Sequence, residues 1–113
     1  MPSVLADNYR NHWRKWSYKA RDWLSQFDAS LPAKLERVES MTGALDEQAL
    51  RDLDISEETN RTIKRFLVHR LDGDPGELVR NARECHGIEQ YRRLAQLCDP
   101  AAGGRNWADA KNL

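Results

Sequence analysis

Residues 8–27 read NYRNHWRKWSYKARDWLSQF, and this stretch indicates the fold class. Its aromatic and apolar side chains recur every three or four residues, which is the period of a helix face and not of a strand. The spacing therefore predicts one long amphipathic helix over 8–27, with an aromatic stripe and a basic face. The stripe comprises Tyr9, Trp13, Trp16, Ala20, Trp23, Leu24 and Phe27.

Three tryptophans on one helix stripe bury a large area when they pack inward. We therefore expect Trp13, Trp16, Trp23 and Phe27 to lie in the core of the domain. A seam between two copies of the chain is the alternative, because the same spacing also fits a heptad repeat.

Helical spacing of apolar residues continues along the rest of the chain, in segments of about 31–42, 46–53, 57–72, 75–86 and 88–98. Phe66 of the third of these segments, and Tyr91 and Leu94 of the last, are expected core residues. Residues 1–7 are expected to be flexible. A further helix is expected to begin at Trp107, and it either docks through Trp107 or continues in a longer parent protein, of which this chain would be a fragment. The predicted N-caps are Ser30, Ser56, Asp74 and Asn106, and the predicted helix ends are Gly43, Gly73 and Gly87.

The composition agrees with an all-α domain. Val, Ile and Thr together number ten among 113 residues, and strands are normally rich in these types. A chain of this length has room for one core, so we expect a single compact bundle of about five to six helices over residues 1–113. A hydrophobic content of 40% with four Trp excludes a chain that is disordered by composition.

The expected setting is the reducing interior of the cell, in the cytoplasm. Two Cys are too few for a disulfide scaffold. No apolar run approaches the roughly 18 residues of a membrane span, and the N-terminus lacks the pattern of a signal peptide. We therefore expect no membrane partner.

Charge is balanced overall but segregated along the chain. The 18 basic and 18 acidic residues cancel, which excludes a strongly basic nucleic-acid binder. Residues 41–76 hold five basic and eight acidic residues, whereas 1–40 hold seven and five. Three interpretations are open: solvated helix faces, complementary surfaces on neighbouring copies, or RNA binding by the first helix. The candidate interface residues are Arg10, Arg14, Arg21, Asp46, Asp52, Glu57 and Glu58.

Catalytic motifs are not visible in the sequence. It contains neither a Gly-rich phosphate loop nor a nucleophile elbow. His12 and His69 are interpreted as surface or edge residues. Cys85 and His86 are adjacent and Cys98 follows thirteen residues later, which is not the paired spacing of a structural zinc site. We predict no catalytic residue, no cofactor and no metal, and hence a protein that is not an enzyme.

Two stretches carry a resemblance to a known family. The first is WRKWSYKARDWL at 13–24, and the second is GIEQYRRL at 87–94, followed by Cys98-Asp99-Pro100 and Gly104-Arg105. They resemble the Gag capsid region of Ty1/copia-like long-terminal-repeat retrotransposons, and the segments 63–68 and 76–79 fit the middle helices of that family. The chain departs from the family pattern at Gln90, at Tyr91 where the family has Trp, and at Cys98 where it has Tyr.

The resemblance covers roughly residues 8–110. It implies the N-terminal lobe of a Gag-like capsid protein, or of a domesticated relative, that associates with copies of itself into a shell around the element's RNA. The family's zinc knuckle, protease and reverse transcriptase would lie downstream of this chain, so RNA contacts would come mainly from parts outside it. A helical adaptor that binds another protein and a small RNA-binding domain are the alternative functions.

Overall fold

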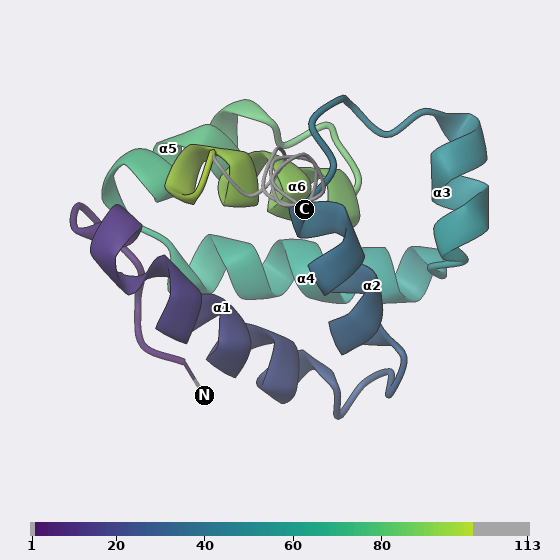
Figure 1. Ribbon diagram of the computed structural model, residues 1–113, viewed down its shortest axis with the longest axis horizontal. Helices are drawn as coiled ribbons and strands as arrows, with labels where there is room; N and C mark the ends of the chain where they lie inside the picture. The colour runs from purple at the N-terminus through teal and green to yellow at the C-terminus, as the bar shows by residue number, and fades with distance from the viewer. Residues whose placement is uncertain (1, 101–113) are drawn as a thin grey trace, which may run out of the picture.

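A computed structural model describes residues 2–100, and this part of the chain is all-helical. The helices form a body of 40 × 33 × 26 Å, with α3 at one end of it (Figure 1). The predicted all-α bundle is thereby confirmed. None of these helices combines the length and the apolar composition needed to cross a membrane. The elements are α1 (Tyr9–Leu24), α2 (Leu31–Glu39), α3 (Glu47–Leu53), α4 (Glu57–Arg70), α5 (Gly73–Asn81) and α6 (Gly87–Cys98).

The core is built around α6, which packs against α1, α2, α4 and α5. Tyr91 and Leu94 of α6 are fully buried. The ring of Trp13 stacks on that of Trp16 at 5.7 Å between centroids and lies 5.8 Å from the ring of Tyr91. Phe66 of α4 is also buried against Trp16. Trp13 and Trp16 of the aromatic stripe are thus part of the intramolecular core, as predicted.

The prediction that Phe27 is a core residue is wrong. α1 ends at Leu24, three residues earlier than expected, and the Phe27 side chain is 52% exposed. Side chains close the helix end: the Ser25 hydroxyl donates to the Asp22 carbonyl, and the Gln26 amide donates to that of Trp23. Because the chain leaves the helix at this point, Phe27 no longer follows the stripe. Trp23 is only half-buried at the boundary of the core.

The N-terminal segment, which was expected to be flexible, makes specific contacts with the body. Leu5 is buried and forms a parallel bridge with Leu71. The Leu5 N–H donates to the Arg70 carbonyl at 3.0 Å, and the Asp72 N–H donates to the Leu5 carbonyl at 2.9 Å. The indole Nε1 of Trp16 donates to the Ser3 carbonyl at 2.7 Å. The two bonds of Leu5 give hydrogen-bond partners to the Arg70 carbonyl and the Asp72 N–H, which lie at the end of α4.

The predicted helix boundaries are correct in some places and wrong in others. Ser56 caps α4 by accepting from the Thr59 N–H, as predicted. Ser30 makes no such cap bond. Asp72, not Asp74, caps α5, and Gly73 begins that helix instead of ending the previous one, with a φ of +56° that suits glycine. The helix predicted to begin at Trp107 lies outside the described residues.

A tight helix crossing joins α4 to the start of α6. A Cβ on Gly87 would collide with the Asn60 carbonyl oxygen, so only glycine fits there without displacement. The buried Asn60 side chain accepts a hydrogen bond from the Ile88 N–H at 3.0 Å. α4 therefore supplies the capping group that the first turn of α6 lacks locally.

Candidate functional site

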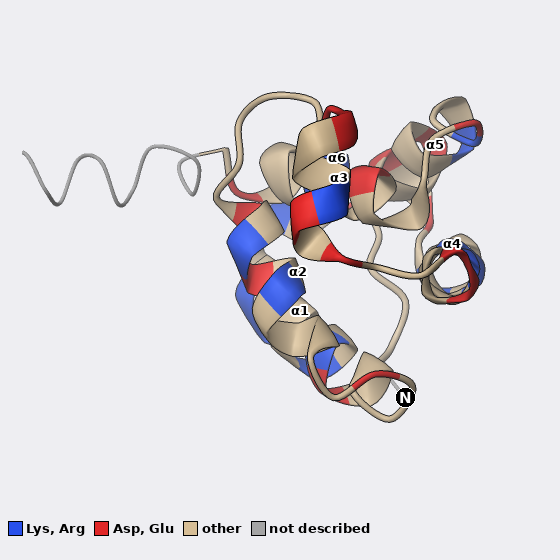
Figure 2. Ribbon diagram, turned by 90° about the vertical axis from the view of Figure 1, so that its right-hand side faces the viewer, with Lys and Arg blue, Asp and Glu red and all other residues tan. Residues whose placement is uncertain are grey.

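The first candidate is a basic surface, which comprises Arg10, Arg14, Lys15 and Lys19 of α1. All four side chains are exposed, and within residues 2–100 none of them forms an ion pair. Arg10 lies over the ring of its neighbour Tyr9. Figure 2 shows the basic residues of α1 and α2 gathered on one side of the body. Four unopposed cations on one helix make this surface attractive to an acidic partner.

Arg21 does not belong to this surface, although the sequence placed it there. Its guanidinium donates to the Glu39 carboxylate of α2 at 2.6 Å and lies 3.8 Å from Glu36. The side chain of Arg21 is only 14% exposed. Arg21 therefore joins α1 to α2 and is not free to bind a partner.

Burial dominates the electrostatics of this pair. It raises the pKa of Glu39 to about 7, against the opposing attraction of Arg21. The fully buried hydroxyl of Tyr91 lies close to both groups and has no well-formed hydrogen bond in the described part of the chain. Burial, and secondarily the nearby Glu39 charge, raises the pKa of this phenol well above its usual value.

The second candidate is an acidic surface on α3 and the start of α4. The predicted interface residues Asp46, Asp52, Glu57 and Glu58 all lie here and are all exposed. Several carboxylates also have local roles: Asp46 caps α3 through the Ala49 N–H, Asp52 accepts from Gln48, and Glu57 pairs with Arg61. Figure 2 shows this surface facing the viewer. Its members are Asp46, Glu47, Asp52, Asp54, Glu57 and Glu58.

A buried ion cluster anchors the loop that leads into α3, and it was not predicted from the sequence. Glu89 of α6 accepts from Arg92 at 2.7 and 3.0 Å, from Arg93 at 2.7 Å, and from the Leu45 N–H at 3.2 Å. Arg92 also donates to the carbonyl of Thr42. Thr42 and Leu45 lie in the loop between α2 and α3, and both are bonded to residues of α6. The cluster therefore fixes the position of the loop that leads into α3. The only signal in the sequence is a carboxylate three and four residues before two arginines, a pattern that is also common on exposed helices.

The electrostatic state of Glu89 is the opposite of that of Glu39. Burial by itself would raise its pKa, but hydrogen bonds from Arg92 and Arg93 outweigh burial and lower the pKa to about 2. The Glu89 carboxylate is therefore ionised at neutral pH.

An aromatic groove lies between the end of α1 and α4. Its lining consists of Trp23, Phe27 and Phe66, with Arg65, His69, Arg70 and Thr62 around them, and its volume is about 300 Å³. Trp23 makes edge-on contacts with Phe27 and with Phe66, each at 5.1 Å between ring centroids. The groove thus combines an apolar floor with a cationic rim.

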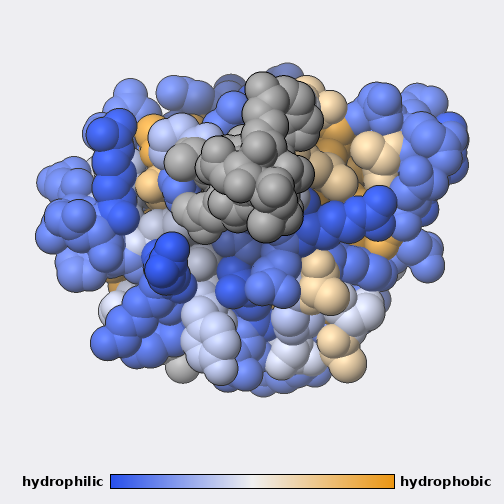
Figure 3. All heavy atoms as spheres, in the orientation of Figure 1, coloured by the Kyte–Doolittle hydropathy of each residue, from blue (hydrophilic) through white to orange (hydrophobic). Residues whose placement is uncertain are grey.

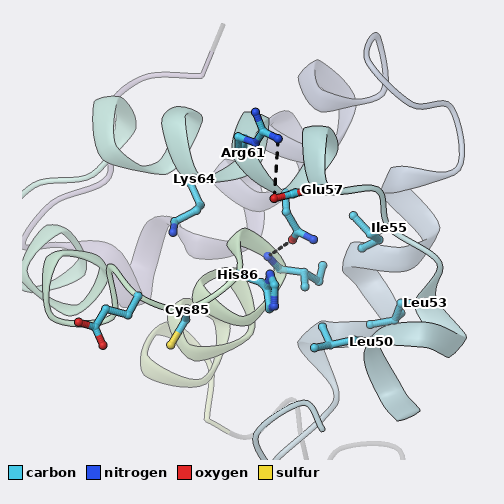
Figure 4. Close-up of a pocket in the computed structure, with 11 residues that line it drawn as sticks. Leu50, Leu53, Ile55, Glu57, Arg61, Lys64, Cys85 and His86 are labelled. Carbon is cyan, nitrogen blue, oxygen red and sulfur yellow. Dashed lines mark hydrogen bonds and ion pairs between the residues drawn. The ribbon is translucent and has the colours of Figure 1, made fainter. Parts of the chain in front are cut away.

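A second hollow of about 510 Å³ lies between α3, α4 and the start of α6 (Figure 4). Leu50, Leu53 and Ile55 line it on the α3 side, and its other walls carry both charge signs. Small hydrophobic patches also reach the surface on the inner side of α3, whereas most of the face seen in Figure 3 is hydrophilic. Leu53 is the buried residue of α3, and Glu47, Gln48, Arg51 and Asp52 are exposed, so much of the surface of this helix is accessible.

The Cys and His residues do not assemble into a metal site within residues 2–100. Cys85 and His86 line the hollow beneath α3, whereas Cys98 is buried at the far end of α6. Burial raises the pKa of the Cys98 thiol to about 12, which leaves it protonated and unreactive. His12 contacts the Asn8 side chain, and His69 lies on the rim of the aromatic groove.

No family model, curated protein or solved structure matches the chain. The resemblance to Gag capsid regions therefore rests on the sequence stretches at 13–24 and 87–94.

Proposed function

We propose that the chain is a structural self-association module of a Gag-like capsid protein, related to those of Ty1/copia-like retrotransposons. It acts through non-catalytic contacts between copies, and the resulting shell encloses the element's RNA. The observation that carries the proposal is the separation of two exposed surfaces of opposite charge, the basic surface on α1 and the acidic surface on α3 and α4.

The placement of the two surfaces supports an assembly rather than a closed pair. α1 and α3 lie at different ends of the body (Figure 1). A contact between two different surfaces is heterologous, and repetition of such a contact generates rings, shells or filaments. Each contact can be weak, because a shell sums many of them.

The charge distribution sets the expected behaviour in salt. Exposed ion pairs are screened at high ionic strength, so association driven by these surfaces weakens as salt is added. The same surfaces favour fast encounter between copies, which suits a particle built from many identical subunits.

Sedimentation velocity of the 113-residue chain over a wide concentration range tests the proposal. We expect oligomers that grow with concentration and dissociate in salt. Arg14→Glu is expected to weaken association about fivefold, the upper range for one exposed charge pair. Arg83→Glu is the matched control, because Arg83 is an exposed arginine outside the basic surface.

Two results would contradict the proposal. A chain that stays monomeric at all concentrations in low salt favours the adaptor function instead. Steeply salt-dependent binding of RNA by the monomer, lost in Arg14→Glu, favours direct RNA binding by α1.

A further inference from the structure

The aromatic groove presents apolar surface that the body of the protein leaves uncovered. Phe27 is 52% exposed although its ring contacts Trp23 edge-on. Trp23 in turn is edge-on to the buried ring of Phe66, so three aromatic rings form one continuous floor from the core to the surface. Aromatic residues in such a position are typical of the central contacts of protein interfaces.

The rim of the groove is cationic and lacks acidic partners. Arg65 is exposed and forms no ion pair within residues 2–100. Arg70 is half-buried and adds a second positive charge to the rim. An acidic group placed at this rim would gain charge attraction from both arginines.

We propose that the aromatic groove receives α3 of a second copy of the chain. This inference rests on the proposed function and adds a contact to it, because the groove's cations Arg65 and Arg70 are not members of the basic surface on α1. Charge favours this occupant, because the groove is lined by cations and no carboxylate. α3 and its flanking residues carry one base, Arg51, and four carboxylates: Asp46, Glu47, Asp52 and Asp54.

The position of α3 makes it available to a neighbouring copy. It stands at one end of the body in Figure 1, and its exposed face carries Glu47, Gln48, Arg51 and Asp52. With seven residues it is about 10 Å long. The Glu89 cluster holds the loop that precedes α3, so α3 loses little conformational freedom when it docks.

The first test removes the exposed aromatic ring. Phe27→Ala is expected to weaken self-association about tenfold, the effect of one well-packed aromatic contact. Val68→Ala is the control, because Val68 is an apolar residue on α4 that is 59% exposed and lies outside the groove and outside the basic surface. Circular dichroism of both variants verifies that the helices are retained. Loss of association in both variants alike would overturn the groove as the specific contact.

The second test exchanges charges between the two partners of the contact. Arg65→Glu and Asp52→Lys are each expected to weaken association about fivefold. A mixture of the two variants brings the acidic rim of the first against the basic helix of the second, and it is expected to restore association to within about twofold of the wild type. Arg83→Glu mixed with Glu77→Lys is the control mixture, since both residues are exposed and lie outside groove and acidic surface.

The outcomes separate this inference from the proposed function. A wild-type chain that does not self-associate overturns both. A wild-type chain that assembles, with Phe27→Ala and Arg65→Glu assembling equally well, overturns only the groove. Tight binding of a single-stranded RNA oligomer that is lost in Phe27→Ala, with self-association unchanged, makes the groove a nucleic-acid site instead.

Discussion

Glu89 is a buried carboxylate and Glu39 a partly buried one. Both meet an arginine, but their surroundings leave them in opposite states. Glu89 accepts hydrogen bonds from Arg92, Arg93 and the Leu45 backbone, and its pKa falls to about 2. Glu39 has one close donor, Arg21, and burial raises its pKa to about 7. The number of donors, more than the presence of an arginine, decides whether a buried carboxylate stays charged.

The Arg21–Glu39 pair, here called the Glu39 cluster, and the Glu89 cluster also support the two surfaces of the proposed assembly. Arg21 and Glu39 join α1, which carries the basic surface, to α2. Glu89 and Arg92 hold the loop from which α3 and its acidic surface project. Substitutions in the clusters therefore test stability and the placement of the surfaces together.

Removal of the Glu89 charge has the largest expected effect. Glu89→Gln leaves Arg92 buried with a neutral partner, because the Arg92 side chain is only 5% exposed. We expect a loss of about 3 kcal/mol in the free energy of unfolding at pH 7, measured by urea denaturation. The same carboxylate gives the wild type a pH dependence: its contribution is complete above pH 4.5 and is lost as the pH falls towards 2.

Glu77→Gln is the control for this prediction, since Glu77 is exposed on α5 and has no ion pair within residues 2–100. A loss below about 1 kcal/mol in Glu89→Gln would contradict the buried cluster. Faster hydrogen exchange at the amides of α3 in this variant would show that the cluster also holds that helix.

Removal of the Glu39 charge is expected to raise the free energy of unfolding, by a smaller amount than removal of the Glu89 charge lowers it. A folded-state pKa of about 7, above the usual 4.5, favours the protonated form in the folded protein. Its stabilisation is complete below pH 4.5 and is lost as the pH rises through 7. Glu39→Gln mimics the protonated form while Glu36 stays near Arg21, so we expect a gain of about 1 kcal/mol at pH 8.

The decisive measurement is the difference in unfolding free energy between pH 5 and pH 8. This difference is expected to shrink in Glu39→Gln and to persist in the Glu36→Gln control, whose side chain is 68% exposed. A Glu39→Gln variant that is less stable than the wild type at pH 8 would show that the ion pair with Arg21 outweighs burial.

The helices could be predicted from the sequence because each buries one apolar face, and the period of such faces is visible without a structure. Ser56 was identified as a cap for the same reason, since its hydroxyl acts on a donor three residues away. Trp13, Trp16 and Tyr91 were correctly expected in the core. These features all depend on local spacing.

Features that depend on distant partners were not predictable. Arg21 follows the exposed Arg14 by two helical turns, so the sequence placed both on one face. The packing of α2 brings Glu39 to Arg21. Leu5 is ordered by a bridge to Leu71, a residue far along the chain. Phe27 is a different case: it continues the stripe in sequence, but bonds made by the neighbouring Ser25 and Gln26 close the helix before it. The aromatic groove follows from that early ending.

The smallest expected effect concerns the hydroxyl of Tyr91. The Glu89 cluster satisfies its donors, whereas the buried Tyr91 hydroxyl near Glu39 has no hydrogen-bond partner in the described residues. Removal of an unsatisfied buried group costs little, because no bond is lost and its desolvation penalty disappears. Tyr91→Phe is therefore expected to change the free energy of unfolding by less than about 0.5 kcal/mol, in urea titrations at pH 7.

Tyr91→Leu is the comparison for this prediction, because it removes the ring that contacts Trp13 and is expected to cost about 2 kcal/mol or more. A loss above about 1 kcal/mol in Tyr91→Phe would mean that the hydroxyl bonds to Arg21 or Glu39 in solution. A hydroxyl bonded to Glu39 would add one donor to that carboxylate, which would still accept from fewer donors than Glu89 does.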